Sequence, residues 1–247
     1  MPKVMNLNRN NKAFVSWSGG KDCCLSLYYA LRDKKDIKYL VSIFDHTGRI
    51  GVHSLTPNII EMQALAIGIP LIQRRVNVTN YDRVFACILH QLKREGIDSG
   101  VFGDVNDGNG HAKVDRGWID RVCRTANVIP YLPLWSKSKE EIFRELIELG
   151  FEVLIIRADN DNLGKKFLGR KVDIELLEEF KHRSIQSSTG EVGYYHTLAI
   201  DGPIFKRRLE ILHADKILNE DEWGSNWNLN IKECQLKDKI QYRSIVS

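Results

Sequence analysis

The first half of the chain alternates short apolar runs with stretches whose apolar residues recur every three to four positions. The first run, residues 13–17, passes directly into the glycine-rich segment 18–22, and apolar side chains then recur at helical spacing over residues 23–32. This order predicts a strand, a tight loop and a helix in immediate succession.

The same alternation continues through residue 126 and predicts further strands and helices. Strands are expected at residues 39–44, 70–76 and 100–103, and helices are expected to begin near Asp22, Thr56 and Thr79, with a fourth over residues 115–126. Strands that alternate with helices in this way form a parallel sheet with helices on its faces. We therefore expect an α/β fold with a doubly wound parallel sheet.

A proline-marked segment, residues 129–135, separates this pattern from a different one. We place a domain boundary there, with one domain over residues 1–128 and a second, smaller α+β domain over residues 129–247. Ser138 and Glu141 have the spacing of a capping box at the start of a helix. The elements expected in the second domain are helices over residues 138–149 and 172–180, a strand over residues 151–156, and mainly strands from residue 194 onward, including the alternating run 227–231.

Composition and charge narrow the class of protein only a little. With 247 residues, of which 43% are hydrophobic, the chain can bury a substantial core. The 36 basic and 32 acidic residues give a net charge of +4, which does not single out a nucleic-acid partner, and we interpret the clusters 34–35 and 206–208 as solvated surface.

The amino-terminal segment and the cysteine content predict the cellular compartment and the redox state of the thiols. The amino terminus has no apolar core like that of a signal peptide, and no segment approaches a membrane-spanning run, so we expect a cytoplasmic protein without a membrane partner. Five cysteines, an odd number, favour reduced thiols, and the absence of a CxxC pair gives a structural zinc site no support.

The segment 18–22, with the sequence SGGKD, has the composition of a phosphate-binding loop. Gly19 and Gly20 let the backbone approach a ligand closely, and the helix that follows offers unpaired N–H groups and the positive end of its dipole. Lys21 could neutralise charge on a departing pyrophosphate, and Asp22 could hold Mg²⁺. The pattern is not the Walker motif GxxxxGK[ST].

This loop resembles the SGGxD signature of PP-loop ATP pyrophosphatases, which adenylate a substrate and release pyrophosphate. Further segments in matching order extend the resemblance over nearly the whole chain to one branch, the diphthine-ammonia ligase family and its bacterial relatives. The segments are VSWSGGKD (15–22), EMQALAIGIPL (61–71), GD (103–104), DRGWIDRVC (115–123), PLW (133–135), FLGR (167–170) and GEVGYYHTLAIDGPIF (190–205).

The resemblance implies a HUP-like nucleotide-binding domain and a ligase reaction. A carboxylate would be adenylated by ATP with Mg²⁺, pyrophosphate would leave, and ammonium would supply an amide nitrogen. In the eukaryotic and archaeal members, the acceptor is the diphthine side chain of the translocating elongation factor. The resemblance also allows a homodimer. The implied ATP-site residues are Ser16, Ser18, Gly19, Gly20, Lys21, Asp22, Phe44, His53, Gly103 and Asp104.

The acceptor side of the site is expected around residues 190–197. Resemblance to the family motif implies acceptor contacts by Glu191, Gly193, His196 and Thr197, with Arg116 and Trp135 as further candidates from matching segments. The residues assigned to the chemistry itself are Lys21, Asp22 and Glu191. Tyr194 departs from the family pattern, because relatives usually have a second glutamate at this position. Residues 187–189 and 164–166 also depart from it.

Four positions also have structural interpretations. His53 could lie over the nucleotide or cap the loop before Thr56, and Asp104 could serve the site or only its own turn. Arg116 suits a phosphate or a carboxylate, but it could instead form a surface ion pair with Asp120. For Cys24 we favour packing into the core over reactivity.

Two other functions remain open at this stage. A related PP-loop enzyme that thiolates tRNA would use the same adenylating loop but would need a sulfur-carrying cysteine. A nucleotide-sensing protein of related fold would bind ATP without turnover.

Overall fold

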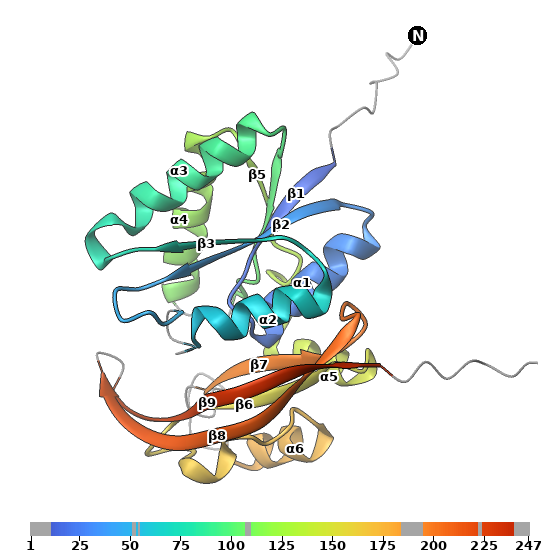
Figure 1. Ribbon diagram of the computed structural model, residues 1–247, viewed down its shortest axis with the longest axis vertical. Coiled ribbons are helices and arrows are strands. Elements are labelled where there is room, and N and C mark those ends of the chain that lie inside the picture. Colours follow the sequence, from blue (N-terminus) through green and yellow to red (C-terminus); the bar gives the residue numbers. More distant parts are fainter. Residues whose placement is uncertain are drawn as a thin grey trace, which may run out of the picture.

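The computed structural model describes residues 11–50, 53, 55–106, 110–183, 195–221 and 224–239. These residues form two β-sheets with helices between them and on their outer faces (Figure 1). Within this part of the chain, no helix is both long enough and apolar enough to cross a membrane.

The first sheet is parallel throughout and has the strand order β3-β2-β1-β4-β5. This order confirms the doubly wound arrangement, because the chain moves outward from β1 in one direction and then returns to the other side of it. Its strands are β1 (Lys12–Ser16), β2 (Asp36–Phe44), β3 (Leu71–Arg75), β4 (Ser99–Val101) and β5 (Ile129–Tyr131).

Four helices cover the two faces of this sheet. Helices α3 and α4 contact each other on one face, and α1 and α2 lie on the face that looks toward the second sheet (Figure 1). Their bounds are α1 (Lys21–Arg32), α2 (Pro57–Ile67), α3 (Tyr81–Arg94) and α4 (Gly110–Thr125), with the short 3-10 turn η2 (Val78–Asn80) before α3.

The central strand β1 is buried on both faces, as expected for a parallel sheet between helices. Phe14 belongs to the core shared with α3 and α4, whereas Ala13 and Val15 belong to a larger core on the opposite face. That larger core also contains Ile155 of β6 and Leu198 of β7. The two parts of the chain therefore share one apolar interior across α1 and α2.

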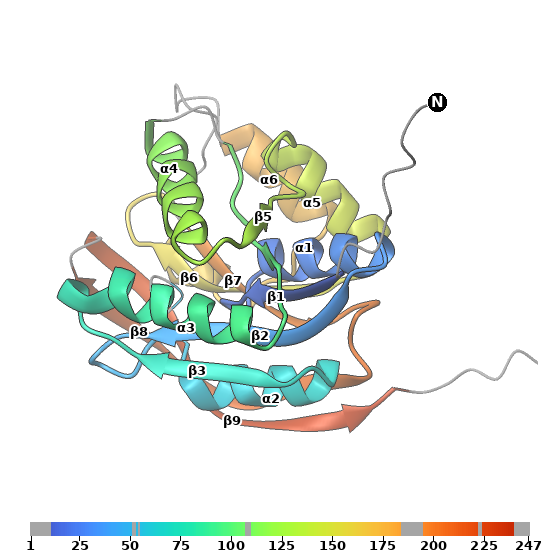
Figure 2. The ribbon, with the colours of Figure 1, turned by 90° about the horizontal axis from the view of Figure 1, so that it is seen from above.

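The second sheet is antiparallel, with the order β7-β6-β9-β8. The expected helix after the proline segment is present as α5, and it begins with the expected capping box: Glu141 N donates to Ser138 Oγ at 3.2 Å and Ser138 N to Glu141 Oε2 at 2.6 Å. Helices α5 and α6 lie side by side (Figure 2). The elements are α5 (Lys139–Glu148), β6 (Glu152–Asp159), η3 (Lys165–Phe167), α6 (Ile174–Arg183), β7 (Tyr195–Asp201), β8 (Arg207–Asp221) and β9 (Gly224–Asp238).

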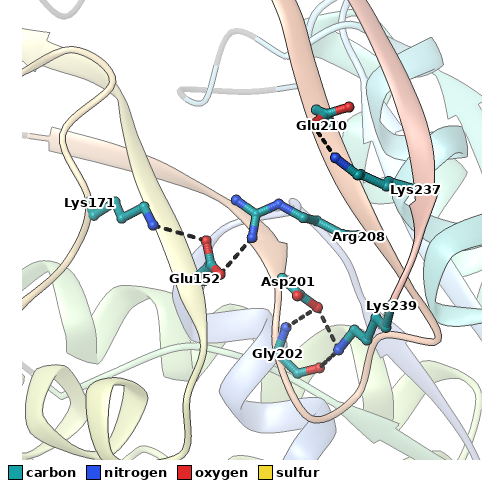
Figure 3. Close-up of polar contacts among 8 residues, drawn as sticks. All are labelled: Glu152, Lys171, Asp201, Gly202, Arg208, Glu210, Lys237 and Lys239. Atoms are coloured by element: carbon teal, nitrogen blue, oxygen red, sulfur yellow. Dashed lines mark hydrogen bonds and ion pairs between the residues drawn. The ribbon is translucent and has the colours of Figure 1, made fainter. Parts of the chain in front are cut away.

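Ion pairs connect strands of this sheet to one another and to the residues next to them (Figure 3). Glu152 of β6 contacts Arg208 of β8 at 2.6 Å and Lys171 at 3.2 Å, and Asp201 pairs with Lys239 at 2.5 Å. Part of the basic cluster 206–208 is thus neutralised by a carboxylate of the same sheet. Such partly exposed pairs each contribute little stability, so we assign them to strand register and not to ligand binding.

The first sheet extends past residue 128, where the proline-marked segment predicted that the first domain ends. Residues 129–131 form β5 and pair with β4, so the chain leaves the first sheet after Tyr131. Pro130 is tolerated there because β5 is an edge strand, where a missing N–H costs no interior ladder bond. The domain division at residues 128 and 129 stays a proposal.

Candidate active site

The glycine-rich loop connects the end of β1 at Ser16 to the start of α1 at Lys21. It lies where the chain order reverses, because β1 has β2 on one side and β4 on the other. In doubly wound sheets this switch point, at the carboxyl ends of the strands, is where ligands bind. Gly19 has a φ of +83°, a backbone conformation that side-chain-bearing residues rarely adopt.

Gly103, just beyond the end of β4, packs directly against the first turn of α1. A Cβ atom at this position would lie 2.8 Å from Cys23 N and 3.0 Å from the carbonyl carbon of Asp22. Both are backbone atoms of a helix start, so neither can move aside easily. Glycine at 103 therefore allows the β4 loop to approach the phosphate loop.

We expect Gly103→Ala to lower the free energy of unfolding by about 1–3 kcal/mol, because the added methyl group meets fixed backbone. Chemical denaturation measures this change. Gly117→Ala is a matched control on α4, where an added Cβ meets nothing within 4 Å and should leave stability unchanged or raise it. Equal effects of the two substitutions would contradict the packing described for Gly103.

Strand β7 of the second sheet lies directly against the glycine-rich loop and is hydrogen-bonded to it. Lys21 N donates a hydrogen bond to Thr197 Oγ1 at 3.0 Å, and Ala199 N donates to the carbonyl oxygen of Gly19 at 3.0 Å. The predicted residue Thr197 is buried, with 2% of its surface exposed. Strand β7 thus holds the glycine-rich loop through hydrogen bonds at both Gly19 and Lys21.

Lys21 and Asp22 form an ion pair at the start of α1, with 2.7 Å between Nζ and Oδ2. Burial alone would lower the pKa of Lys21, but the Asp22 carboxylate and the nearby Tyr195 hold that pKa above its ordinary value. Lys21 Nζ also lies over the Tyr195 ring, 5.6 Å from its centroid. The lysine is therefore a permanent cation beside the loop.

The other carboxylate oxygen of Asp22, Oδ1, is buried and has no hydrogen-bond partner among the described residues. An unpaired buried carboxylate oxygen is costly unless a cation or a donor from a ligand completes it. Magnesium takes few protein carboxylates and fills its shell with phosphate oxygens and water, so a single aspartate fits that ion. The described residues contain no group of three or more histidine, cysteine or acidic side chains able to hold a metal by themselves.

A cavity of about 520 Å³ opens beside the loop at the carboxyl ends of the strands. This volume is within the range of pockets that hold nucleotide-sized ligands. Seven of the ten residues predicted for the ATP site line it, and Gly19, Gly20 and Lys21 lie next to it in the loop. The seven are Ser16, Ser18, Asp22, Phe44, His53, Gly103 and Asp104.

Most of the remaining wall is apolar or aromatic and was not predicted from the sequence. Tyr81 is 38% exposed, but desolvation of its hydroxyl and the Asp104 carboxylate raise its pKa to about 12, so the hydroxyl stays protonated. Because ligands collect at the carboxyl ends of parallel strands, the residues directly after β2 and β3 could have been found by that rule. The unpredicted lining residues are Trp17, Cys23, Val41, Ile43, Asp45, Ile50, Val76, Asn77, Tyr81 and Phe85.

His53 lies against the loop and lines the cavity. At the start of α2, the N-cap residue Thr56 makes no side-chain capping hydrogen bond. A Cβ atom at Gly20 would be 2.7 Å from His53 Cε1, and the His53 and His196 rings have centroids 4.8 Å apart. Desolvation lowers the pKa of His53 to about 4 and lowers that of His196 well below its usual range. Both imidazoles are therefore neutral near pH 7 and add no charge to the loop.

Cys23 and Cys24 follow the loop on the first turn of α1. Cys24 is fully buried in the core, as favoured from the sequence, and burial raises its pKa well above the ordinary value. Burial would also raise the pKa of Cys23, but hydrogen bonds from Cys24, Ser18 and Gly19 hold it below the ordinary value. Cys23 Sγ lies 3.1 Å from the carbonyl oxygen of Gly20, so this thiol supports the loop.

Of the residues predicted for the acceptor side, the four that the structure describes, Arg116, Trp135, His196 and Thr197, do not line the cavity. Arg116 Nε pairs with Asp120 Oδ2 at 3.0 Å, the surface ion pair considered as its alternative, and its guanidinium lies over the Trp135 ring at 5.5 Å. His196 and Thr197 lie on β7 behind the loop. Glu191, Gly193 and Tyr194 lie outside the described residues.

Comparison with protein-family models matches residues 11–130 to the diphthamide synthase N-terminal domain and residues 138–236 to the diphthamide synthase C-terminal domain. The chain belongs to the diphthamide synthase family. The two matched regions leave residues 131–137 between them, next to the proline-marked segment.

The curated proteins whose sequences match this chain are named diphthine–ammonia ligases. The mouse and human proteins are each 24% identical to this chain over 245 residues, covering 90% of the chain and 91% of the relative. The protein from the fission yeast Schizosaccharomyces pombe is 24% identical over 92% of this chain, but the match covers only 40% of that longer protein.

Comparison with solved structures gives two partial matches. A predicted subunit of tRNA methyltransferase from Methanocaldococcus jannaschii matches with a TM-score of 0.45 and 16% identity over 78% of this chain and 98% of that one. A U34-tRNA thiolase from Methanococcus maripaludis matches with a TM-score of 0.35 and 19% identity over 56% of this chain and 57% of that one.

Proposed function

We propose that this diphthamide synthase family member is an ATP-dependent ligase that adenylates a carboxylate, releases pyrophosphate and converts the carboxylate to an amide with ammonia. The observation that carries the proposal is the SGGKD loop at the switch point, beside a cavity that its own Asp22 lines. The name shared by the curated relatives supports the same reaction class.

The cavity suggests how ATP is oriented. Its apolar and aromatic wall, with Val41, Phe44 and Tyr81, suits the adenosine, whereas the loop suits the phosphates. Loop amides and the positive end of α1 would face the phosphate oxygens, and Lys21 would add a full charge. Asp22 would hold a magnesium ion, which supplies charge neutralisation to the phosphates when bound.

The reaction needs no strong base in this chain. A carboxylate oxygen of the acceptor attacks the α-phosphorus, the bond from that phosphorus to the bridging oxygen breaks, and pyrophosphate leaves with the bonding electrons. Ammonia then attacks the acyl carbon and loses a proton, AMP leaves, and the acceptor ends as a carboxamide. The chain contributes positioning and stabilisation of the pyrophosphate charge by Lys21 and the loop amides.

For the acceptor, we propose the diphthine carboxylate of the translocating elongation factor, as the names of the relatives suggest. The acceptor would approach from the second-domain side, and the segment containing Glu191, Gly193, His196 and Thr197 would choose it. Arg116 beside Trp135 is a second candidate contact for its carboxylate. We also propose that this protein forms a homodimer.

The acceptor is tested by incubating the protein with ATP, magnesium, ¹⁵N-ammonium and elongation factor that carries diphthine. Mass spectrometry of the modified peptide should show one ¹⁵N atom in a new carboxamide. The matched control replaces ATP with its α,β-methylene analogue, which cannot release pyrophosphate and should give no product. AMP formation with an unchanged elongation factor would overturn this acceptor, and a chain that never forms AMP would overturn the ligase reaction itself.

A further inference from the structure

Gln63 of α2 is a polar side chain with no exposed surface, placed in the core between the two sheets. A buried amide is costly unless its donors and acceptor are paired. Here Trp17 Nε1 donates to Gln63 Oε1 at 2.8 Å, while Gln63 Nε2 donates to the carbonyl oxygens of Gly19 at 3.0 Å and Ala199 at 2.7 Å. One side chain therefore joins the phosphate loop, α2 and β7.

The carbonyl of Gly19 is the point where these contacts meet. Its oxygen accepts from both Gln63 Nε2 and Ala199 N, and a Cβ atom at Gly19 would lie 2.9 Å from Gln63 Oε1. The described peptide bonds include no cis bond, so the N–H of Gly20 points opposite to the Gly19 carbonyl in the same peptide plane. Holding that carbonyl against β7 therefore turns the next loop amide away from the second sheet.

We propose that Gln63 is a positioning residue of the adenylation site: it holds the Gly19 carbonyl against β7 and so turns the Gly20 amide toward the departing pyrophosphate. The inference rests on the proposed ligase function. It also makes strand β7 of the second domain a working part of the ATP site. Gln63 itself touches no substrate in this arrangement.

The first test compares Gln63→Met, which removes all three hydrogen bonds at similar side-chain volume, with Gln73→Met. Gln73 of β3 donates to the Pro57 carbonyl at 2.8 Å, so the control loses a comparable bond to backbone away from the loop. Both variants should melt at lower temperature. Only Gln63→Met should lower the kcat for AMP formation, by on the order of tenfold, while the Kd for ATP changes less than about threefold, because the adenosine wall is untouched.

Hydrogen exchange gives a readout that does not depend on turnover. Amides in peptides that cover residues 17–22 and 195–201 should exchange faster in Gln63→Met than in Gln73→Met. If the wild-type protein forms no AMP, the ligase proposal fails, but this comparison still decides whether Gln63 locks the loop. Unchanged exchange together with a kcat within about twofold of wild type would overturn the inference.

Gln63→Glu supplies a rescue experiment. Its ionised carboxylate still accepts from Trp17 but repels the two carbonyl oxygens, whereas protonation restores one donor. The titratable and charged groups that interact around this loop are Lys21, Asp22, Cys23 and Cys24 at the start of α1, His53 before α2, Arg157 on β6, and Tyr195 and His196 on β7. All of them are unchanged in the variant, so the ratio of variant to wild-type kcat removes the effects of their own titration. That ratio should rise about tenfold from about pH 8.5 to about pH 6, and a ratio independent of pH would overturn the inference.

Discussion

Lys21→Met should lower the rate of AMP formation by about a hundredfold or more while the protein stays folded, as expected when one preorganised charge is removed from a transition state. The lysine is held beside the loop by its ion pair with Asp22, and its raised pKa keeps it charged over the whole working range. Methionine keeps most of the packing against Tyr195 but supplies no charge to the pyrophosphate. Single-turnover measurements with saturating ATP would give the rate directly.

Lys93→Met is the matched control, because Lys93 forms a partly buried ion pair with Asp98 in the same domain but away from the cavity. Its rate should stay within about twofold of wild type. If Lys21→Met is folded and as active as this control, Lys21 has no part in the chemistry.

Asp22→Asn should lower AMP formation by about a hundredfold or more and raise the magnesium concentration needed for half-maximal rate by about tenfold or more. The amide keeps the shape of the carboxylate, but it removes the negative charge of a group whose Oδ1 is buried without a hydrogen-bond partner among the described residues. It also removes the anion that raises the pKa of Lys21. A magnesium titration of the initial rate measures both effects.

Asp98→Asn removes the carboxylate of the control ion pair and should leave the magnesium dependence unchanged. A normal magnesium requirement in Asp22→Asn, with AMP still formed, would remove Asp22 from the metal site. Lys93→Met and Asp98→Asn each break an ion pair away from the cavity, whereas Lys21→Met and Asp22→Asn break the ion pair at the loop. A rate loss found only in the second pair of variants is therefore due to the loop and not to the loss of an ion pair.

Much of the fold could be predicted because its signals are local. The apolar run at residues 13–17, the two loop glycines and the amphipathic segment that follows all occur within about twenty residues. The capping box at Ser138 was equally local and was confirmed. The switch-point rule predicted a site role for Gly103 and Asp104, and both follow β4 and line the cavity, because the carboxyl ends of parallel strands share one edge of the sheet.

The rest of the site depends on contacts between distant parts of the chain. Thr197 meets the Lys21 amide across 176 positions, and Gln63 meets Ala199 across 136, so neither pairing leaves a periodic signal in the sequence. Family resemblance suggested Thr197 as an acceptor contact, which stays a prediction, but it did not suggest the hydrogen bond that the Lys21 amide donates to its hydroxyl.

The bond broken in ATP tests the proposed function most directly. ATP labelled at the α-phosphorus, incubated with the protein, magnesium, ammonium and the elongation factor, should yield labelled AMP and unlabelled pyrophosphate. A loop that holds the β- and γ-phosphates as a leaving group directs attack to the α-phosphorus, whereas kinase-like loops give ADP. The label should appear in AMP, and its formation should depend on Lys21. Labelled ADP whose formation is abolished by Lys21→Met would contradict the account, even though the loop would then still bind ATP.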